Sequence, residues 1–191
     1  MPSVPIVCPY TNLRPETKAA LTDEDVTFVD VSYADDAYYW VLQGVWHRQQ
    51  GVIIVEHDIV PPRGAIDALR ACPRAWCGVP YLVGVNWDSG LGCVKFAPEL
   101  MVRFPDAVDR FESTHWQTLD GQLIGYLRPL LGEGAHLHWP AARHLNDCGD
   151  ETRVLTNCPQ CGGPIRFEEA RGGPNTVRCQ QGHWVNYFAL G

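Results

Sequence analysis

Two acidic side chains, Glu56 and Asp58, directly follow an apolar run and are the residues in this chain best placed to do chemistry. The segment reads GVIIVEHDIVPP, so Val and Ile dominate it and two prolines end it. Such a run indicates a buried strand of a covered, largely parallel sheet. Ligands bind at the carboxyl ends of strands in α/β sheets, where two nearby carboxylates can hold a divalent cation against a phosphate. We therefore predict metal-assisted phosphate chemistry. The alternative is that these acidic residues only solvate a turn or cap a helix.

A second set of chemically informative residues lies near the end of the sequence. Cys158 and Cys161 are spaced C-x2-C, and after 17 intervening residues Cys179 and His183 are spaced C-x3-H. Three thiolates and one imidazole form a closed tetrahedral set suited to structural zinc. Short apolar pieces at 164–167, 176–178 and 184–188 are typical of small strands. We predict a zinc ribbon that owes much of its stability to the metal, against the alternative of four unrelated residues.

Length and charge limit the choice of function. The chain has 191 residues, 46% of them hydrophobic, which is enough for one domain of ordinary size and a smaller one. The formal net charge of −7 divides into −9 over residues 1–151 and +2 over residues 152–191. An acidic body of this kind is not a general nucleic-acid binder.

The expected cellular location follows from the lack of a recognisable signal peptide and of a membrane-spanning stretch in this sequence. The first residues, MPSVPIVCPY, lack the basic start of a signal peptide, and no apolar stretch is long enough to span a bilayer. The eight cysteines then indicate metal ligands and free thiols rather than disulfides. We expect a cytoplasmic protein with no membrane partner.

Hydrophobic patterns predict alternating strands and helices over residues 1–150, which favours a Rossmann-like α/β domain with a mostly parallel sheet. Residues 151–191 form the expected ribbon domain. The predicted strands span 4–8, 26–31, 51–62, 77–85 and 135–139, and residues 92–96 are predicted to form a strand or a loop. The predicted helices span 34–50, 62–71, 98–104 and 116–131, and the aromatic residues of the first helix are interpreted as packing.

The order of these pieces over residues 3–147 resembles the GT-A fold glycosyltransferases, especially small family 2-like enzymes, some of them phage-encoded. The resemblance implies that the loop ending the first strand, with Pro9, Tyr10 and Thr11, packs on the nucleotide of a nucleotide-sugar donor. It also implies that Asp30, at the end of the second strand, contacts the base.

The same resemblance implies the catalytic machinery. Glu56-His57-Asp58 matches the D-x-D motif that binds Mn²⁺ or Mg²⁺, with Glu in place of the first Asp, and residues 90–96 match a glycine-bearing segment before the acceptor site. Asp120 matches the general base. His138 and His144 compete as the histidine that completes the metal site. Because His136 and His138 alternate along a predicted strand, we expect only one of them to face the site.

These residues together predict a metal-dependent glycosyltransferase acting by inverting single displacement on a hydroxyl acceptor. The Q-x-x-R-W motif of processive synthases is absent, so a polymerising enzyme is not expected. The basic ribbon either delivers an acceptor, for example a modified base in DNA, or closes one side of the cleft. The alternatives are a metal-dependent nucleotidyltransferase or nuclease, and a non-enzymatic adapter that binds through its ribbon.

Overall fold

A computed structural model of the chain describes residues 4–83, 86–88, 90–132, 134–145, 151–154, 157–158, 160–164, 176–186 and 188–190. Its centre is a six-stranded sheet with the order β2-β1-β3-β8-β5-β9. The strands are β1 (Ile6–Tyr10), β2 (Val26–Asp30), β3 (Val52–Val55), β5 (Trp76–Gly78), β8 (Cys93–Phe96) and β9 (His136–Leu137). β8 is antiparallel to both of its neighbours, and the other strands share one direction. The predicted mixed α/β architecture with a mostly parallel sheet is confirmed.

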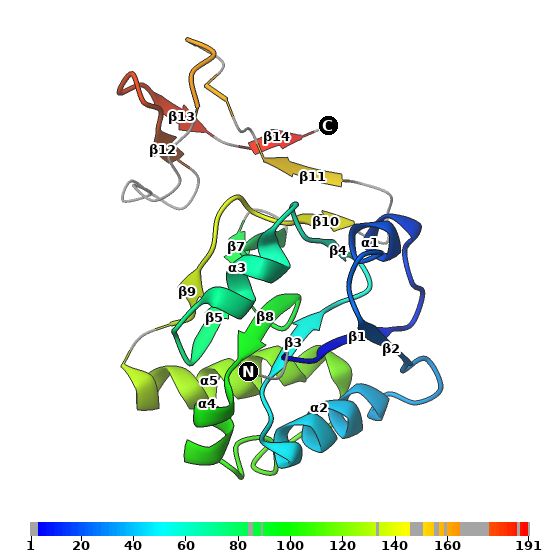
Figure 1. Cartoon of the computed structure of the whole chain (residues 1–191). Coiled ribbons are helices and arrows are strands. Elements are labelled where there is room, and N and C mark those ends of the chain that lie inside the picture. The colour runs from blue at the N-terminus through cyan, green and yellow to red at the C-terminus, as the bar shows by residue number, and fades with distance from the viewer. Residues whose placement is uncertain are drawn as a thin grey trace.

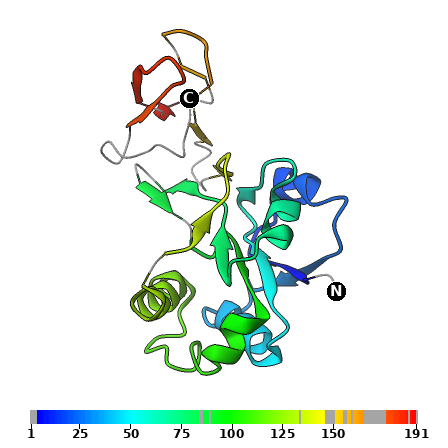
Figure 2. The same ribbon diagram turned by 60° about the vertical axis from the view of Figure 1, so that its left-hand side comes forward.

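Helices cover both faces of this sheet (Figures 1 and 2). One face carries α2 (Ala37–Arg48), α4 (Pro98–Arg103) and α5 (Leu119–Leu131), and the other carries α1 (Pro15–Ala20) and α3 (Ala65–Ala71). Alternate residues of β3 supply the two cores: Val52 and Ile54 pack on the first face, and Ile53 and Val55 on the second. A strand covered on both sides needs apolar residues at every position, which explains the continuous run in the sequence.

Several predicted elements are shorter or divided. The strand predicted over 51–62 ends at Val55, and the chain turns before it resumes as β4 (Ile59–Val60) in another sheet. The strand predicted over 77–85 is split into β5 and β6 (Tyr81–Val83), and β6 forms a hairpin with β7 (Asn86–Asp88). A short 3₁₀ helix, η1 (Trp116–Thr118), precedes α5, and α1 was not predicted.

A second sheet joins the C-terminal segment to the body. It has the order β14-β11-β10-β4 and contains β10 (Arg143–Leu145), β11 (Glu151–Val154) and β14 (Phe188–Leu190). The expected domain boundary at residue 150 therefore falls between two paired strands, β10 and β11. β12 (Thr176–Arg178) and β13 (Trp184–Asn186) form a separate hairpin, drawn in red in Figure 1. Of the piece predicted over 164–167, residues 165–167 lie outside the described residues.

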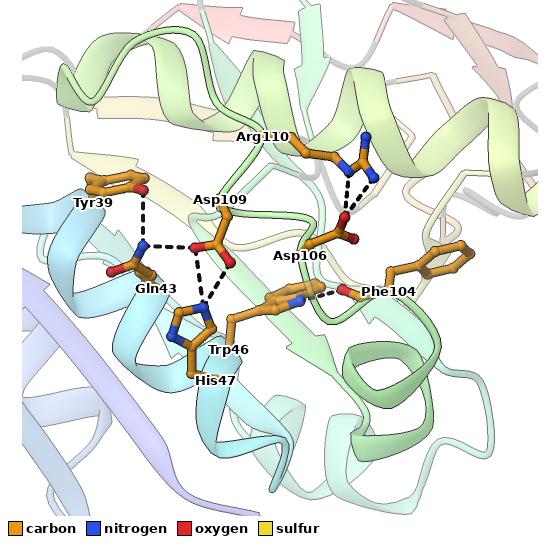
Figure 3. A network of polar contacts seen from close by, with 8 residues as sticks. All are labelled: Tyr39, Gln43, Trp46, His47, Phe104, Asp106, Asp109 and Arg110. Carbon is orange, nitrogen blue, oxygen red and sulfur yellow. Dashed lines mark hydrogen bonds and ion pairs between the residues drawn. The ribbon is translucent and has the colours of Figure 1, made fainter.

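Polar contacts fix α2 to the segment that follows α4 (Figure 3). The indole Nε1 of the fully buried Trp46 donates to the Phe104 carbonyl at 2.7 Å. Gln43 donates to Asp109 at 2.7 Å, and His47 lies 2.9 Å from the same carboxylate. These contacts hold the helix that faces β3 in place. None of the helices in the described part of the chain has both the length and the apolar character needed to cross a membrane.

Candidate functional site

A cavity of about 210 Å³ opens where β1, β2 and β3 end. Its wall is formed by Pro9, Thr11, Val31, Ala34, Tyr38, Glu56, His57, Asp58 and Trp116. The sequence singled out four of these nine as nucleotide or metal contacts, namely Pro9, Thr11, Glu56 and Asp58. They come together because parallel strands place their carboxyl ends at the same edge of the sheet.

Glu56 is held at the cavity by two contacts from different elements. Its side chain accepts a hydrogen bond from the Tyr38 hydroxyl at 3.0 Å, and its backbone N–H donates to the Gly92 carbonyl at 2.9 Å. Burial raises the pKa of Tyr38, and the negative charges of Glu56 and Asp120 raise it further. The Tyr38 hydroxyl therefore stays protonated and acts as a donor. The interpretation of this tyrosine as packing alone was incomplete, because it also orients a carboxylate.

Asp58 lies beside His144, a residue 86 positions later in the chain. The Asp58 Oδ2 and His144 Nε2 atoms are 3.3 Å apart, and both side chains are largely buried. The contact follows from strand pairing, because His144 of β10 is opposite Ile59 of β4. Burial alone would raise the pKa of Asp58, but the hydrogen bond from His144 and the nearby imidazoles of His57 and His144 outweigh it and lower the pKa. Asp58 is therefore a carboxylate at neutral pH.

His138 and His144, the two candidates for the histidine of the catalytic metal site, lie in different surroundings. His144 contacts Asp58, whereas His138 forms a group with Cys72 and His136. Neither His136 nor His138 borders the cavity, and both belong to the same group. The expectation that they lie on opposite faces was wrong, because residues two apart on a strand share a face. Their rings lie 5.0 Å apart.

Asp120, at the start of α5, is fixed by the glycine-bearing segment. Its Oδ1 accepts a hydrogen bond from the Leu91 backbone N–H at 2.8 Å. Gly90 lies so close that an added Cβ would stand 2.6 Å from Asp120 Oδ2. The segment predicted to precede an acceptor site thus contacts the predicted general base, and the Asp120 charge acts on Tyr38 of the cavity wall.

Tyr10 and Asp30 pair across the ends of β1 and β2, beside the residues that form the cavity wall. Asp30 is exposed and accepts hydrogen bonds from the side chain and backbone of Ser32, at 2.6 Å and 2.9 Å. These bonds lower the pKa of Asp30. Its predicted contact with a base stays a prediction.

No sequence pattern indicated that Trp116 would line this cavity. It was assigned only to the start of a predicted helix, yet it lines the cavity and is 53% exposed. Its backbone N–H donates to the Asp35 carbonyl at 3.0 Å, which brings the start of η1 to the loop before α2. A contact across 81 residues leaves no local pattern in the sequence.

The four predicted zinc ligands form a group that can hold a metal ion. Their ligand atoms all lie within 4.8 Å of one another. The Cys161 and Cys179 sulfur atoms are 3.7 Å apart, and His183 Nδ1 lies 3.6 Å from Cys179 and 3.8 Å from Cys158. Ligands about 2.3 Å from a tetrahedral zinc ion are separated by about 3.8 Å. Burial raises the pKa of Cys179, but hydrogen bonds from the backbone of His183 and Gln181 outweigh it and lower the pKa to about 7, which favours the thiolate.

Comparisons with known proteins add little. No family model matches the chain, and no curated protein matches it. Among solved structures, the chain is similar to the one described as "Crystal Structure of A197 from STIV", with a TM-score of 0.47 and 7% sequence identity over 96% of this chain and 94% of that chain. A likeness at this level indicates nothing about ligands or activity.

Proposed function

We propose that the chain is a metal-dependent glycosyltransferase that moves a sugar from a nucleotide-sugar donor to a hydroxyl acceptor. The observation that carries the proposal is the pairing of Asp58 with His144 beside a cavity that Pro9, Thr11 and Trp116 also border. A carboxylate and an imidazole that meet at the edge of a sheet, next to a cavity, form a site for a cation and an anionic ligand.

Asp58 and His144 would hold Mn²⁺ or Mg²⁺. Their ligand atoms are 3.3 Å apart, and neighbouring ligands about 2.1 Å from an octahedral ion are separated by about 3 Å. The pairing of a carboxylate with an imidazole favours Mn²⁺ of the two, because Mg²⁺ prefers oxygen ligands alone. When bound, the ion would neutralise the charge that develops on the leaving diphosphate. Glu56, oriented by Tyr38, adds negative charge on the same wall of the cavity.

The apolar part of the wall suits the nucleoside of the donor. Pro9, Val31 and Ala34 border it together with the half-exposed Trp116 ring, which can stack on a planar base. Asp30 lies at the end of β2, one residue before Val31. The base would therefore lie near Asp30, and the diphosphate near Asp58.

Asp120 is the carboxylate we assign as general base. Its fixed position, through the bond from Leu91, supports removal of a proton from an attacking hydroxyl, a step worth about 10² to 10⁴ in rate. A base acting directly on the acceptor implies single displacement with inversion at the sugar. The Cys158, Cys161, Cys179 and His183 group would hold structural zinc, and the ribbon around it would present an acceptor such as a modified base in DNA.

A thermal-shift panel of UDP-, GDP-, CDP-, ADP- and TDP-linked sugars, with and without Mn²⁺, tests the proposal. A ligand at about 100 times its dissociation constant stabilises the folded state by about 2.7 kcal/mol. We expect one nucleotide class to raise the melting temperature only with Mn²⁺, and the rise to disappear in Asp58→Asn. The matched control is Asp23→Asn, because Asp23 is exposed in the turn after α1; this variant should respond like the wild type.

Two results would contradict the proposal. A panel without any shift, on a wild-type protein that unfolds cooperatively, would favour a non-enzymatic adapter. Release of pyrophosphate from nucleoside triphosphates, or cutting of DNA, without sugar transfer would favour the nucleotidyltransferase or nuclease class.

A further inference from the structure

We propose that Cys72, His136 and His138 form a further transition-metal site. It is separate from the Asp58–His144 pair and from the Cys3His group, which consists of Cys158, Cys161, Cys179 and His183. One ligand atom from each residue lies within 4.8 Å of the other two. This inference does not depend on the proposed transferase activity, because none of the three residues borders the cavity described above.

The backbone that carries these ligands is fixed by regular structure. Cys72 ends α3, and its N–H donates to the Ala68 and Leu69 carbonyls. His136 of β9 is paired with Cys77 of β5, and the His138 N–H donates to the Gly78 carbonyl at 2.9 Å. The three residues therefore come from a helix end and the edge of the central sheet, where regular secondary structure sets their backbone positions.

One ring nitrogen of His138, a member of this group, is buried without a hydrogen-bond partner among the described residues that would explain its position. His138 Nε2 is shielded from solvent and has no hydrogen-bond partner within the described part of the chain. Buried polar atoms without a partner are rare in folded proteins, and an ion is one of their common explanations. Cys72 is only 7% exposed, whereas His136 is exposed, so an ion could enter from the solvent side of His136.

The donor set selects the kind of metal. One sulfur and two imidazole nitrogens suit Zn²⁺, whereas Mg²⁺ and Ca²⁺ require oxygen ligands. The ammonium group of the buried Lys95 donates to the Cys72 carbonyl. Its positive charge repels a cation, so electrostatic attraction alone would not hold a metal ion at this site. A zinc ion bound by a thiolate and two imidazoles overcomes that repulsion through its ligand bonds. Three protein ligands leave a fourth position for water, as in zinc sites that exchange ligands.

Zinc counting on the full chain tests this site. The protein is stripped with a chelator, equilibrated by dialysis against micromolar zinc, and analysed for zinc per chain by mass spectrometry. We expect His136→Ala and Cys72→Ser each to hold one zinc ion fewer than the wild type. The control Cys93→Ser changes a buried cysteine of the same core cluster that is not a ligand, and it should hold the wild-type number.

The Cys3His group is distinguished by combining variants. Cys161→Ser should lower the zinc count by one, and His136→Ala added to it should lower the count by one more. His136 is exposed on an edge strand, so its replacement leaves the core intact even if Cys72→Ser fails to fold. A His136→Ala protein with the wild-type zinc count would overturn the proposal.

Discussion

Asp58 keeps its charge in a largely buried position because His144 hydrogen-bonds to it. The pKa of Asp58 in the folded state is below the ordinary 3.8, so its contribution to stability is fully present above that pH and is lost as the pH falls through the depressed pKa. We expect Asp58→Asn to lower the free energy of unfolding at pH 7 by about 1 to 3 kcal/mol. Urea unfolding at pH 7 and at about pH 3 should show the gap from the wild type shrinking on acidification. A gap that stays constant would mean that the charge of Asp58 does not stabilise the fold.

A substitution at the neighbouring Gly90 can displace the Asp120 carboxylate while leaving the aspartate itself in place. An alanine Cβ at position 90 would stand 2.6 Å from Asp120 Oδ2, so the carboxylate must shift away from the Leu91 N–H. If Asp120 is the general base, a displacement of about 1 Å should lower turnover roughly 100-fold in Gly90→Ala. Overpacking should also lower the free energy of unfolding by about 1 to 3 kcal/mol.

Gly125→Ala is the matched control for this variant. Gly125 lies within the same helix, α5, and an added Cβ there meets nothing within 4 Å. We expect it to stabilise the protein by about 0.5 to 1 kcal/mol without a change in turnover. The sugar-transfer rates of both variants are measured at saturating donor. If the rate of Gly90→Ala equals that of Gly125→Ala, Asp120 is not the general base.

At the level of single residues, the sequence allowed us to predict those candidate site residues that belong to a short local motif. Glu56 and Asp58 follow from an apolar run that ends in carboxylates, and the Cys3His group follows from its spacing. The choice between His138 and His144 does not, because the pairing of β10 with β4 decides which imidazole reaches Asp58. The role of Tyr38 was missed for the same reason, since its partner Glu56 lies on another element.

At the level of elements, the break between β3 and β4 shows the limit of hydrophobic pattern. The apolar residues continue past Asp58, so a single strand was predicted, yet the Ile59 N–H turns back to the Glu56 carbonyl at 3.1 Å. β4 then pairs with β10, which lies more than 80 residues later in the chain. No local sequence pattern predicts that pairing. The turn that this pairing creates is what places Asp58 at the cavity.

The attachment of α2 gives a test at this level. Trp46 is fully buried, donates to the Phe104 carbonyl and packs edge-on against Phe96, whereas the contacts of Asp109 with α2 are largely exposed. We expect Trp46→Ala to lower the free energy of unfolding by about 3 to 5 kcal/mol. Asp109→Ala should lower it by about 1 kcal/mol or less, because exposed ion pairs contribute little. Chemical denaturation of the two variants should therefore separate packing from surface charge, and equal losses would contradict this ranking.

Across the whole molecule, a continuous path of strands leads from the Cys3His group to Asp58. Cys179 follows β12 and His183 precedes β13, and the chain then passes to β14, which pairs with β11. β11 pairs with β10, which carries His144, and β10 pairs with β4, which begins directly after Asp58. The Cys and His spacing predicted a separate ribbon domain over residues 151–191, but that spacing contains no information on strand pairing across the boundary.

This path predicts that the metal in the Cys3His group supports the site at Asp58. We expect loss of a metal bound there to free the β12–β13 hairpin and loosen β14, so that β10 holds His144 less firmly against Asp58. We expect Cys161→Ser to weaken Mn²⁺ binding about 5-fold or more, the lower end of typical coupling between sites. Titration of Mn²⁺ into the zinc-loaded wild type and into Cys161→Ser, with His136→Ala as the control for loss of a zinc ion elsewhere, measures the effect. Equal Mn²⁺ affinities in the wild type and Cys161→Ser would mean that the second sheet joins the two regions without coupling their metals.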